Sequence, residues 1–469
     1  MWDTVDAEDR VKIRRRIRAG AAACAWAILI ALCSAPGAAR ASEAREITLK
    51  DAIATALRSN VDLAQAATAV DSRKVGVTQS EADFLPSLGA SARAGRSYSR
   101  RLDATTNDFT GFNSNSFSLG LSSSLDLFTG FGRIASLQES RLSLDAQRKT
   151  YAQTRQDIVF SVITSFAQAA VNGQVIKVNE ENLAAQKRLL EQIQAFYKAG
   201  RNSVADLYQQ QAAAADAERQ LLVANRNYQV SLFQLLQVMG INPGTESRIV
   251  EPDIESIIAE ASGLNVGDPL EVALARRYDL LSQQKQIEAA RTQITVSRSG
   301  YWPTLSLSAS AGTSYSSTLS DQFDFSEQLE DANPNASIGL SFSLPLFDRL
   351  ATRSAVQQSK IQLRQAEIAT DRLKLQIGVE VRQALEDYAE AQKEVEVSAA
   401  QLKYSEQALK SIEARYTVKA STLLEVIQAR SAYYQAGYQS INARYNLLLK
   451  GISMAYFRGD LDGITSLFE

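Results

Sequence analysis

Histidine is absent from the 469-residue chain, and its absence removes whole classes of chemistry. Without an imidazole, neither a Ser-His-Asp nor a Cys-His catalytic arrangement is possible, and no metal site can use histidine ligands. Carboxylates and tyrosines remain, but the sequence contains no nucleotide-binding loop and no clustered acidic motif. We therefore expect a protein that is not an enzyme and that has no cofactor or metal.

Cysteine is nearly absent, because Cys24 and Cys33 are the only two and both lie within the first 41 residues. This segment has a basic start, an apolar run and a small-x-small sequence that ends at Ala41, as an export signal does. The apolar run of about thirteen residues is too short to cross a bilayer, which needs about 20. We expect residues 1–41 to be removed as a signal peptide, which leaves a chain without cysteine.

The chain also has little net charge and little proline. The 50 Lys and Arg residues nearly balance the 52 Asp and Glu residues, so charge gives no reason to expect nucleic acid as a partner. Residues 133–199 and 351–418 contain no proline and one glycine each. Helices over these ranges would be about 100 Å long at about 1.5 Å per residue, which exceeds an ordinary globular domain.

Apolar residues in these long runs recur at alternating steps of three and four, which is typical of a coiled coil. In the first run the predicted seam is Ile176, Leu183, Leu190, Ile193 and Tyr197. The other positions are rich in Ala, Gln, Ser and charge, and they are too polar to be buried on every side. The helices therefore fit either a solvated coiled coil or a tube of helices that lines water.

The stretch 337–347, S-I-G-L-S-F-S-L-P-L-F, alternates apolar residues with serine and glycine. Such alternation predicts a strand with one apolar and one polar face. Three other stretches share the pattern, and the predicted strands are about 87–98, 116–128, 304–316 and 336–347. We expect a polar loop over about 100–115 and an acidic loop over about 321–331.

The predicted strands are about as long as strands that cross a bilayer in a tilted barrel. Four strands are too few to close such a barrel, since the smallest need about eight. An open sheet edge in lipid would leave backbone groups unpaired. The sequence therefore predicts an oligomer in which several copies share one barrel.

The chain also contains an internal repeat. Asp51, Ala56, Leu57, Asp62 and Leu63 match Asp268, Ala273, Leu274, Asp279 and Leu280, and residues 120–128 match 339–347. We predict a first repeat over 42–250, a linker over 251–267 and a second repeat over 268–469, with long helices over about 131–239 and 349–457. Each repeat then reads as helix, strand, loop, strand, long helix, tip and helix.

This duplicated order resembles the TolC-like outer membrane efflux proteins, the outer membrane factors of Gram-negative bacteria. The strand endings 125–128 and 344–347 and the two helix tips carry the resemblance. It implies a mixed fold: a homotrimer whose twelve-stranded membrane β-barrel takes four strands from each chain and continues into a long α-helical barrel in the periplasm. The implied function is a passive outer membrane exit duct of a tripartite efflux or type I secretion system.

The resemblance also implies partners: a periplasmic adaptor protein, an inner-membrane efflux pump or ABC transporter, and outer membrane lipid. No residue identifies the cargo. The alternative is a non-conducting scaffold, in which the strands anchor a coiled-coil spacer in the outer membrane.

Both helix tips read as a helix end, a short turn and a new helix, with Asn202 in the first tip and Ser421 or Thr422 in the second as caps. By resemblance, Glu425 takes the first position of a carboxylate ring that makes the closed end of the duct cation-selective. Like charges around a narrow pore would attract cations and repel anions. Gln428 stands where the second acid of the ring is expected.

The resemblance further implies a closing hydrogen-bond network at the tips. Asp206 and Tyr416 match two of its members. The arginine expected near Ser421 is missing, so Lys419 or Arg201 would have to take its place.

Overall fold

A computed structural model describes residues 45–102, 107, 109–250 and 268–459. The predicted signal peptide and the predicted linker over 251–267 lie outside these residues. The chain divides into two units, and the smaller one holds the described residues 45–46 and 244–248. The short strands β1 (Arg45–Ile47) and β4 (Ser247–Ile249) form a two-stranded sheet. All other elements below belong to the larger unit.

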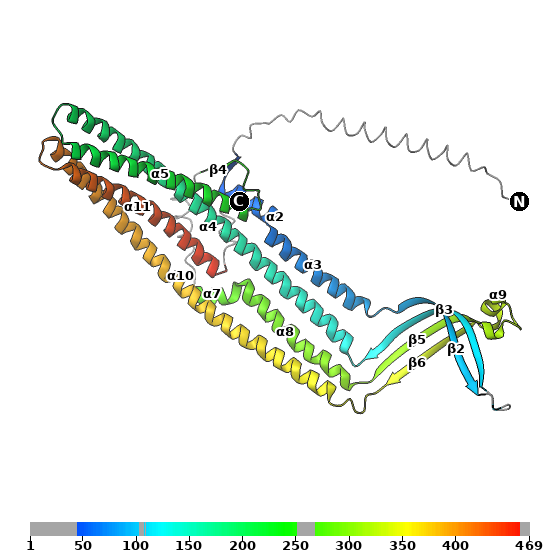
Figure 1. Cartoon of the computed structure of the whole chain (residues 1–469). Coiled ribbons are helices and arrows are strands. Elements are labelled where there is room, and N and C mark those ends of the chain that lie inside the picture. Colours follow the sequence, from blue (N-terminus) through cyan, green and yellow to red (C-terminus); the bar gives the residue numbers. More distant parts are fainter. Residues whose placement is uncertain (1–44, 103–106, 108, 251–267, 460–469) are drawn as a thin grey trace, which may run out of the picture. The chain divides into compact units, whose positions relative to one another are not determined.

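Two capped helices lead to the main sheet (Figure 1). Helix α2 (Leu49–Ser59) begins after Thr48, whose hydroxyl accepts the Asp51 N–H at 3.1 Å, and α3 (Val61–Ala82) begins after Asn60. The Asn60 side chain also donates to the Val238 carbonyl at 2.8 Å, which ties this junction to the end of a later helix. Helix α3 ends before Pro86, as the sequence predicts.

The main sheet is antiparallel and has the strand order β2-β3-β5-β6. Its strands are β2 (Ser87–Leu102), β3 (Phe109–Thr129), β5 (Thr304–Ser316) and β6 (Asn335–Ser343). The polar loop expected over 100–115 is mostly wrong, because β2 and β3 pair up to Leu102 and Phe109. Polar residues favour loops locally, but pairing between strands overrides that preference.

The last strand is shorter than predicted, since β6 ends at Ser343 and not near 347. Pro345 has no N–H to donate to a ladder, so the strand stops before it. The acidic loop is also more regular than expected. The connection from β5 to β6, which includes this loop, contains η2 (Ser317–Leu319), α9 (Phe325–Glu327) and η3 (Gln328–Ala332), and the Gln328 side chain is buried.

The strand register places two chemistries on opposite faces of the sheet. One face carries the apolar residues Leu88, Ala90, Leu119, Leu121, Leu307, Ala309, Ile338 and Leu340. The other carries serine and glycine, including Ser87, Gly89, Ser91, Gly120, Ser122, Ser308, Ser310, Ser337 and Gly339. Both faces are largely exposed in the single chain; Leu88, for example, is 80% exposed. An exposed apolar face of this size indicates contact with another subunit or with lipid.

Long helices follow the second strand of each half. Helices α4 (Gly132–Lys198) and α10 (Ala351–Thr417) have 67 residues each, and α5 (Val204–Val238) and α11 (Leu423–Phe457) have 35 each. Phe131 and Leu350 precede the two longest helices in the left-handed region, with φ of 65° and 67°, so each helix begins with a sharp turn of the chain.

The long helices pack in antiparallel pairs, α4 with α5 and α10 with α11 (Figure 1). The shorter α7 (Pro269–Arg276) and α8 (Tyr278–Arg298) lie against α10, and α8 also lies against α4. The main core lies where α2, α4, α5 and α11 meet, around buried residues such as Phe166, Leu235 and Ile452. Among the described residues, α4 contains a stretch apolar enough to cross a membrane, but half of that stretch is buried inside the protein, as in a core helix.

The predicted seam of α4 is confirmed at Ile193, which is fully buried, but it is one position off at Leu183 and Leu190. The buried residues toward the tip are Asn182, Gln186, Leu189 and Ile193, whereas Leu183 and Leu190 are only half-buried. The contact between α4 and α5 is therefore built partly from amides, and the leucines beside it lie at its margin.

Candidate functional site

The first helix tip joins α4 to α5. Gly200 has a φ of 70°, a left-handed conformation that glycine adopts without strain and that ends α4. The N-cap of α5 is Ser203, not the predicted Asn202. The Ser203 hydroxyl accepts the Asp206 N–H at 3.1 Å, and the Asp206 carboxylate accepts the Ser203 N–H at 3.0 Å. Asp206 therefore closes a capping box.

The second tip repeats this arrangement between α10 and α11. Lys419 takes the left-handed conformation with a φ of 62°, and Thr422 is the N-cap of α11. The Thr422 hydroxyl accepts the Glu425 N–H at 3.3 Å, and the Glu425 carboxylate accepts the Thr422 N–H at 2.9 Å. Glu425 and Gln428 are exposed one turn apart, so they lie on the same side of α11.

Asp206 and Glu425 therefore occupy equivalent positions, each in the first turn of a helix. The unpaired N–H groups and the helix dipole favour negative charge there. In each cap, one carboxylate oxygen accepts the N–H of the N-cap residue.

A pocket of about 360 Å³ lies between the two tips. It brings together four of the six predicted residues, Asp206, Tyr416, Lys419 and Arg201, and it also includes Asn202. Glu425 and Gln428 do not line it. The tips are therefore in contact, and their predicted closing residues share one water-accessible space.

Within this pocket, Asp206 and Tyr416 are not hydrogen-bonded to each other. Tyr416 accepts a hydrogen bond from the Asn202 amide at 3.4 Å, and the Asp206 carboxylate is used by its capping box. The Arg201 guanidinium lies 5.1 Å from the centre of the Phe196 ring. Among the described residues of the single chain, neither Arg201 nor Lys419 forms an ion pair with Asp206.

Several polar residues below the tips were not predicted from the sequence. The buried Gln210 amide of α5 donates to the Gln186 carbonyl at 3.0 Å and to its side-chain oxygen at 2.8 Å. On the second pair, Arg430 of α11 contacts Glu413 and donates to the Ala185 carbonyl of α4 at 3.2 Å. These bonds join neighbouring helices at defined heights, which fixes their register near the tips.

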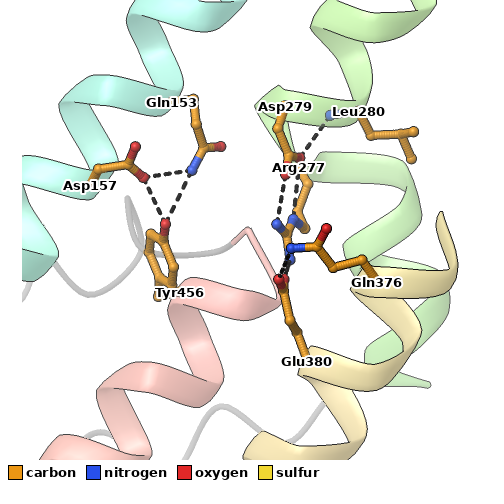
Figure 2. Close-up of polar contacts among 8 residues, drawn as sticks. All are labelled: Gln153, Asp157, Arg277, Asp279, Leu280, Gln376, Glu380 and Tyr456. Carbon is orange, nitrogen blue, oxygen red and sulfur yellow. Dashed lines mark hydrogen bonds and ion pairs between the residues drawn. The ribbon is translucent and has the colours of Figure 1, made fainter. Parts of the chain in front are cut away.

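Two further polar groups lie at the other end of the hairpins, near the end of α11 (Figure 2). Tyr456 donates to the Asp157 carboxylate at 2.7 Å, and Gln153 donates to the same carboxylate at 2.7 Å. Burial, together with this hydrogen bond to a carboxylate, raises the pKa of Tyr456 well above its usual range, so the phenol stays protonated. The bond holds the end of α11 to α4.

The second group is a buried ion triad. Figure 2 shows Arg277 between Asp279 and Glu380, with ion-pair distances of 2.6 and 2.5 Å. The Arg277 side chain is only 9% exposed. Burial disfavours the charged guanidinium, but the bonds to both carboxylates outweigh it, so the pKa of Arg277 is raised. The triad ties the start of α8 to α10.

Aromatic residues mark both ends of the apolar face of the sheet. At the loop end, Phe117 pairs with Tyr315 across the strands, and Phe325 of α9 packs on both rings at centroid distances of 6.0 and 4.9 Å. At the helix end, Phe131 packs edge-on against Phe128 and Trp302 at 5.2 and 6.2 Å. Aromatic rows that bound an apolar band are a feature of transmembrane β-barrels.

A short antiparallel sheet of this kind, joined to paired helices of 67 and 35 residues, is the fold that this chain shares with solved outer membrane channels. The sequence model described as "Outer membrane efflux protein" matches residues 52–241 and 270–455. The chain belongs to this family.

Individual relatives agree with the family. The chain is 25% identical to outer membrane protein TolC of Escherichia coli strain K12 over 413 residues, which cover 86% of this chain and 80% of TolC. It is 25% identical to protein CyaE of Bordetella pertussis over 416 residues, covering 89% and 85% of the two chains. It is 24% identical to the pyoverdine export outer membrane protein OpmQ of Pseudomonas aeruginosa over 408 residues, covering 85% and 82%.

Solved structures share the fold at lower identity. The CmeC outer membrane channel of Campylobacter jejuni has a TM-score of 0.75 at 17% identity and covers 88% of this chain and 86% of its own. The outer membrane protein VceC of Vibrio cholerae has a TM-score of 0.72 at 20% identity, with coverage of 88% and 96%. The chain is thus an outer membrane protein of a Gram-negative bacterium and a channel-family member, not an enzyme.

Proposed function

We propose that three copies of this chain close a twelve-stranded barrel that conducts substrates passively across the outer membrane. The observation that carries the proposal is the division of the sheet into a serine and glycine face and an apolar face bounded by aromatic rows. In a closed barrel the first face lines water and the second contacts lipid. Edge strands β2 and β6 have no partner on their outer sides within the described chain, and pairing them between copies removes both edges.

The spacing of the aromatic rows supports this orientation. Leu305 pairs with Phe128 at one row and Tyr315 pairs with Phe117 at the other, so ten residues of β5 separate the rows. This is about 33 Å along a strand, or about 25 Å across the membrane at a tilt of about 40°. The apolar band of an outer membrane barrel is also about 25 Å tall.

We further propose that the chain is the exit duct of a tripartite efflux or type I secretion system. The long helices would then form a tunnel in the periplasm, where an adaptor protein joins it to an inner-membrane pump or ABC transporter. Similarity to CyaE and to the pyoverdine exporter OpmQ supports this role. A wide lumen lined with serine and glycine makes few specific contacts, which suits a passive duct.

Control of the duct is proposed to lie at the helix tips. Three copies of Glu425 would form a carboxylate ring, and the pocket around Asp206, Asn202 and Tyr416 would hold neighbouring hairpins together in the closed state. The Asp206→Ala and Tyr416→Phe double variant is expected to raise single-channel conductance. A conductance equal to that of the parent would remove these residues from the closing contact.

The proposal is tested by extracting the protein from outer membranes in detergent, measuring the mass of the assembly, and recording currents after reconstitution in planar bilayers. We expect a mass of three chains and discrete conductance steps. Stable trimers without conductance would instead support the coiled-coil scaffold.

A further inference from the structure

The two edge strands of the sheet carry opposite charges near the same end. On edge strand β2, Arg96 and Arg100 lie on the apolar face, beyond the row of Phe117 and Tyr315. The loop that precedes the other edge strand, β6, carries Glu330 and Asp331 in its last turn. All four charged side chains are exposed, and none forms an ion pair with another described residue.

Aromatic rings hold the two arginines in place. The Arg96 guanidinium lies 5.1 Å from the centre of the Tyr98 ring, and that of Arg100 lies 5.2 Å from the centre of the Phe109 ring. Such cation–π contacts fix a guanidinium while leaving its N–H groups free to donate. The edge of β2 therefore presents two ordered cations without an acidic partner among the described residues.

The acidic residues are also held in place. The Thr313 hydroxyl donates to the Leu329 carbonyl at 2.7 Å, and the Asn333 amide donates to the Ser314 carbonyl at 2.8 Å. These bonds fasten the residues on both sides of Glu330 and Asp331 to strand β5. The carboxylates therefore lie just beyond the start of β6, at the margin of the sheet opposite β2.

Barrel geometry brings these two margins together. One row of residues runs across the sheet from Asn335 through Gly312 and Gly120 to Ser91. Closing a barrel with strands about 4.8 Å apart and tilted by about 40° shifts the pairing by about 16 Å, or about four to six residues, for every four strands. The number of residues must be even, because residues that pair across two strands share one face of the sheet. The shift runs toward the loop end of β2, because the loops of both hairpins then end at a similar level.

With a shift of four residues, Asn335 of one copy lies opposite Gly95 in the β2 strand of the next copy, and both residues belong to the serine and glycine face. Asp331 and Glu330, four and five residues before Asn335, then lie level with Ser99 and Arg100. We infer that Arg96 and Arg100 of each copy form ion pairs with Glu330 and Asp331 of its neighbour. This inference rests on the proposed barrel that the three copies share. These pairs would form an electrostatic clasp across the β2–β6 junction, repeated at every subunit boundary.

The clasp would stabilise the boundary between subunits, where β2 of one copy pairs with β6 of the next. Pairing of β2 with β6 between copies is the only backbone contact that closes the proposed barrel, and it must form in the correct register. Opposite charges at matching heights favour that register, and a slip by two residues would separate them. Because the charges are exposed, salt should weaken the contact.

Cysteine cross-linking tests the contact directly, since residues 42–469 contain no cysteine. In the Arg100→Cys and Asp331→Cys double variant, mild oxidation is expected to yield covalent dimers and trimers on non-reducing gels after boiling. The Arg93→Cys and Asp331→Cys variant is the matched control, because Arg93 lies on the same strand but on the opposite face of the sheet. It should yield no cross-linked species. The absence of cross-links in a trimeric Arg100→Cys and Asp331→Cys variant would overturn the clasp.

Charge reversal provides a second test in the assembled protein. Arg96→Glu with Arg100→Glu should lower the temperature at which trimers dissociate, and adding Glu330→Lys with Asp331→Lys should restore it. Reversal without rescue, combined with lost binding of phosphorylated lipid A in detergent, would assign the arginines to lipid and overturn the clasp. A parent protein that is not trimeric would overturn the proposed function itself, whereas a conducting trimer that is indifferent to these changes would overturn only the clasp.

Discussion

The buried ion triad around Arg277 permits a quantitative prediction. Arg277→Ala removes the cation and leaves the Asp279 and Glu380 carboxylates close together, where they are only 25% and 23% exposed. Breaking a fully buried pair in this way costs about 3–5 kcal/mol. Because water reaches about a quarter of each carboxylate, we expect the free energy of unfolding to fall by about 2–4 kcal/mol.

The assay is the loss of helical circular dichroism on heating purified protein in detergent. Unfolding entropy is about 2.1 cal/mol/K per residue, or about 0.9 kcal/mol/K for residues 42–469, so the midpoint should fall by about 2–4 °C. The matched control is Lys285→Ala on the same helix, whose ion pair with Glu288 is 37% and 45% exposed. That change should shift the midpoint by less than about 1 °C.

A second variant separates charge from packing. Arg277→Met together with Asp279→Asn and Glu380→Gln removes all three charges while keeping similar volumes. We expect it to regain part of the lost stability, because no unpaired charge remains buried. If Arg277→Ala matched the Lys285→Ala control, the triad would not hold α8 to α10 and the reasoning would be wrong.

Three other predictions concern the tips and the helices. Glu425→Gln keeps the capping box, since glutamine also accepts the N-cap N–H, but removes the charge; reversal potentials in planar bilayers should show reduced cation preference, and Gln428→Glu should increase it. Ser203→Ala should lower stability to heat by about 0.5–2 kcal/mol through loss of the cap, and an unchanged melting midpoint would contradict this. Gly240→Ala should be strongly destabilising, because its φ is 72° and a Cβ would lie 2.3 Å from a backbone oxygen, whereas Gly378→Ala in an open helical position should stabilise the chain by about 0.5–1 kcal/mol.

Much of the fold is readable from the sequence because its signals are local. Strand faces follow from alternation with period two, and the long helices follow from proline-free runs that end at Gly200 and near Lys419. The loop predicted over 100–115 is wrong for a non-local reason. Serine, asparagine and arginine favour loops on their own, but here they pair across β2 and β3.

Part of the candidate site at the helix tips can be predicted from the sequence. Asp206 and Tyr416 do share a pocket, whereas Asn202 proves to be a hydrogen-bond partner of Tyr416 and not a cap. Arg277 could not be found, because its partner Glu380 lies 103 positions away and a single arginine among many charged residues carries no signal. The α4 seam is predicted correctly at Ile193 but is misplaced earlier in the helix, because Asn182 and Gln186 are buried amides at positions where a coiled-coil pattern expects apolar residues. The roles of Glu425 and Gln428 in ion selectivity remain predictions.

The most direct test asks whether the serine and glycine face lines a conducting lumen. Ser122→Cys places a thiol on that face, and Leu121→Cys places one on the apolar face of the same strand. In reconstituted protein, a water-soluble, membrane-impermeant maleimide should label Ser122→Cys and lower its single-channel conductance, and it should leave Leu121→Cys unlabelled with unchanged conductance. Equal labelling of both positions, or labelling of Ser122→Cys without any change in conductance, would contradict a water-filled barrel.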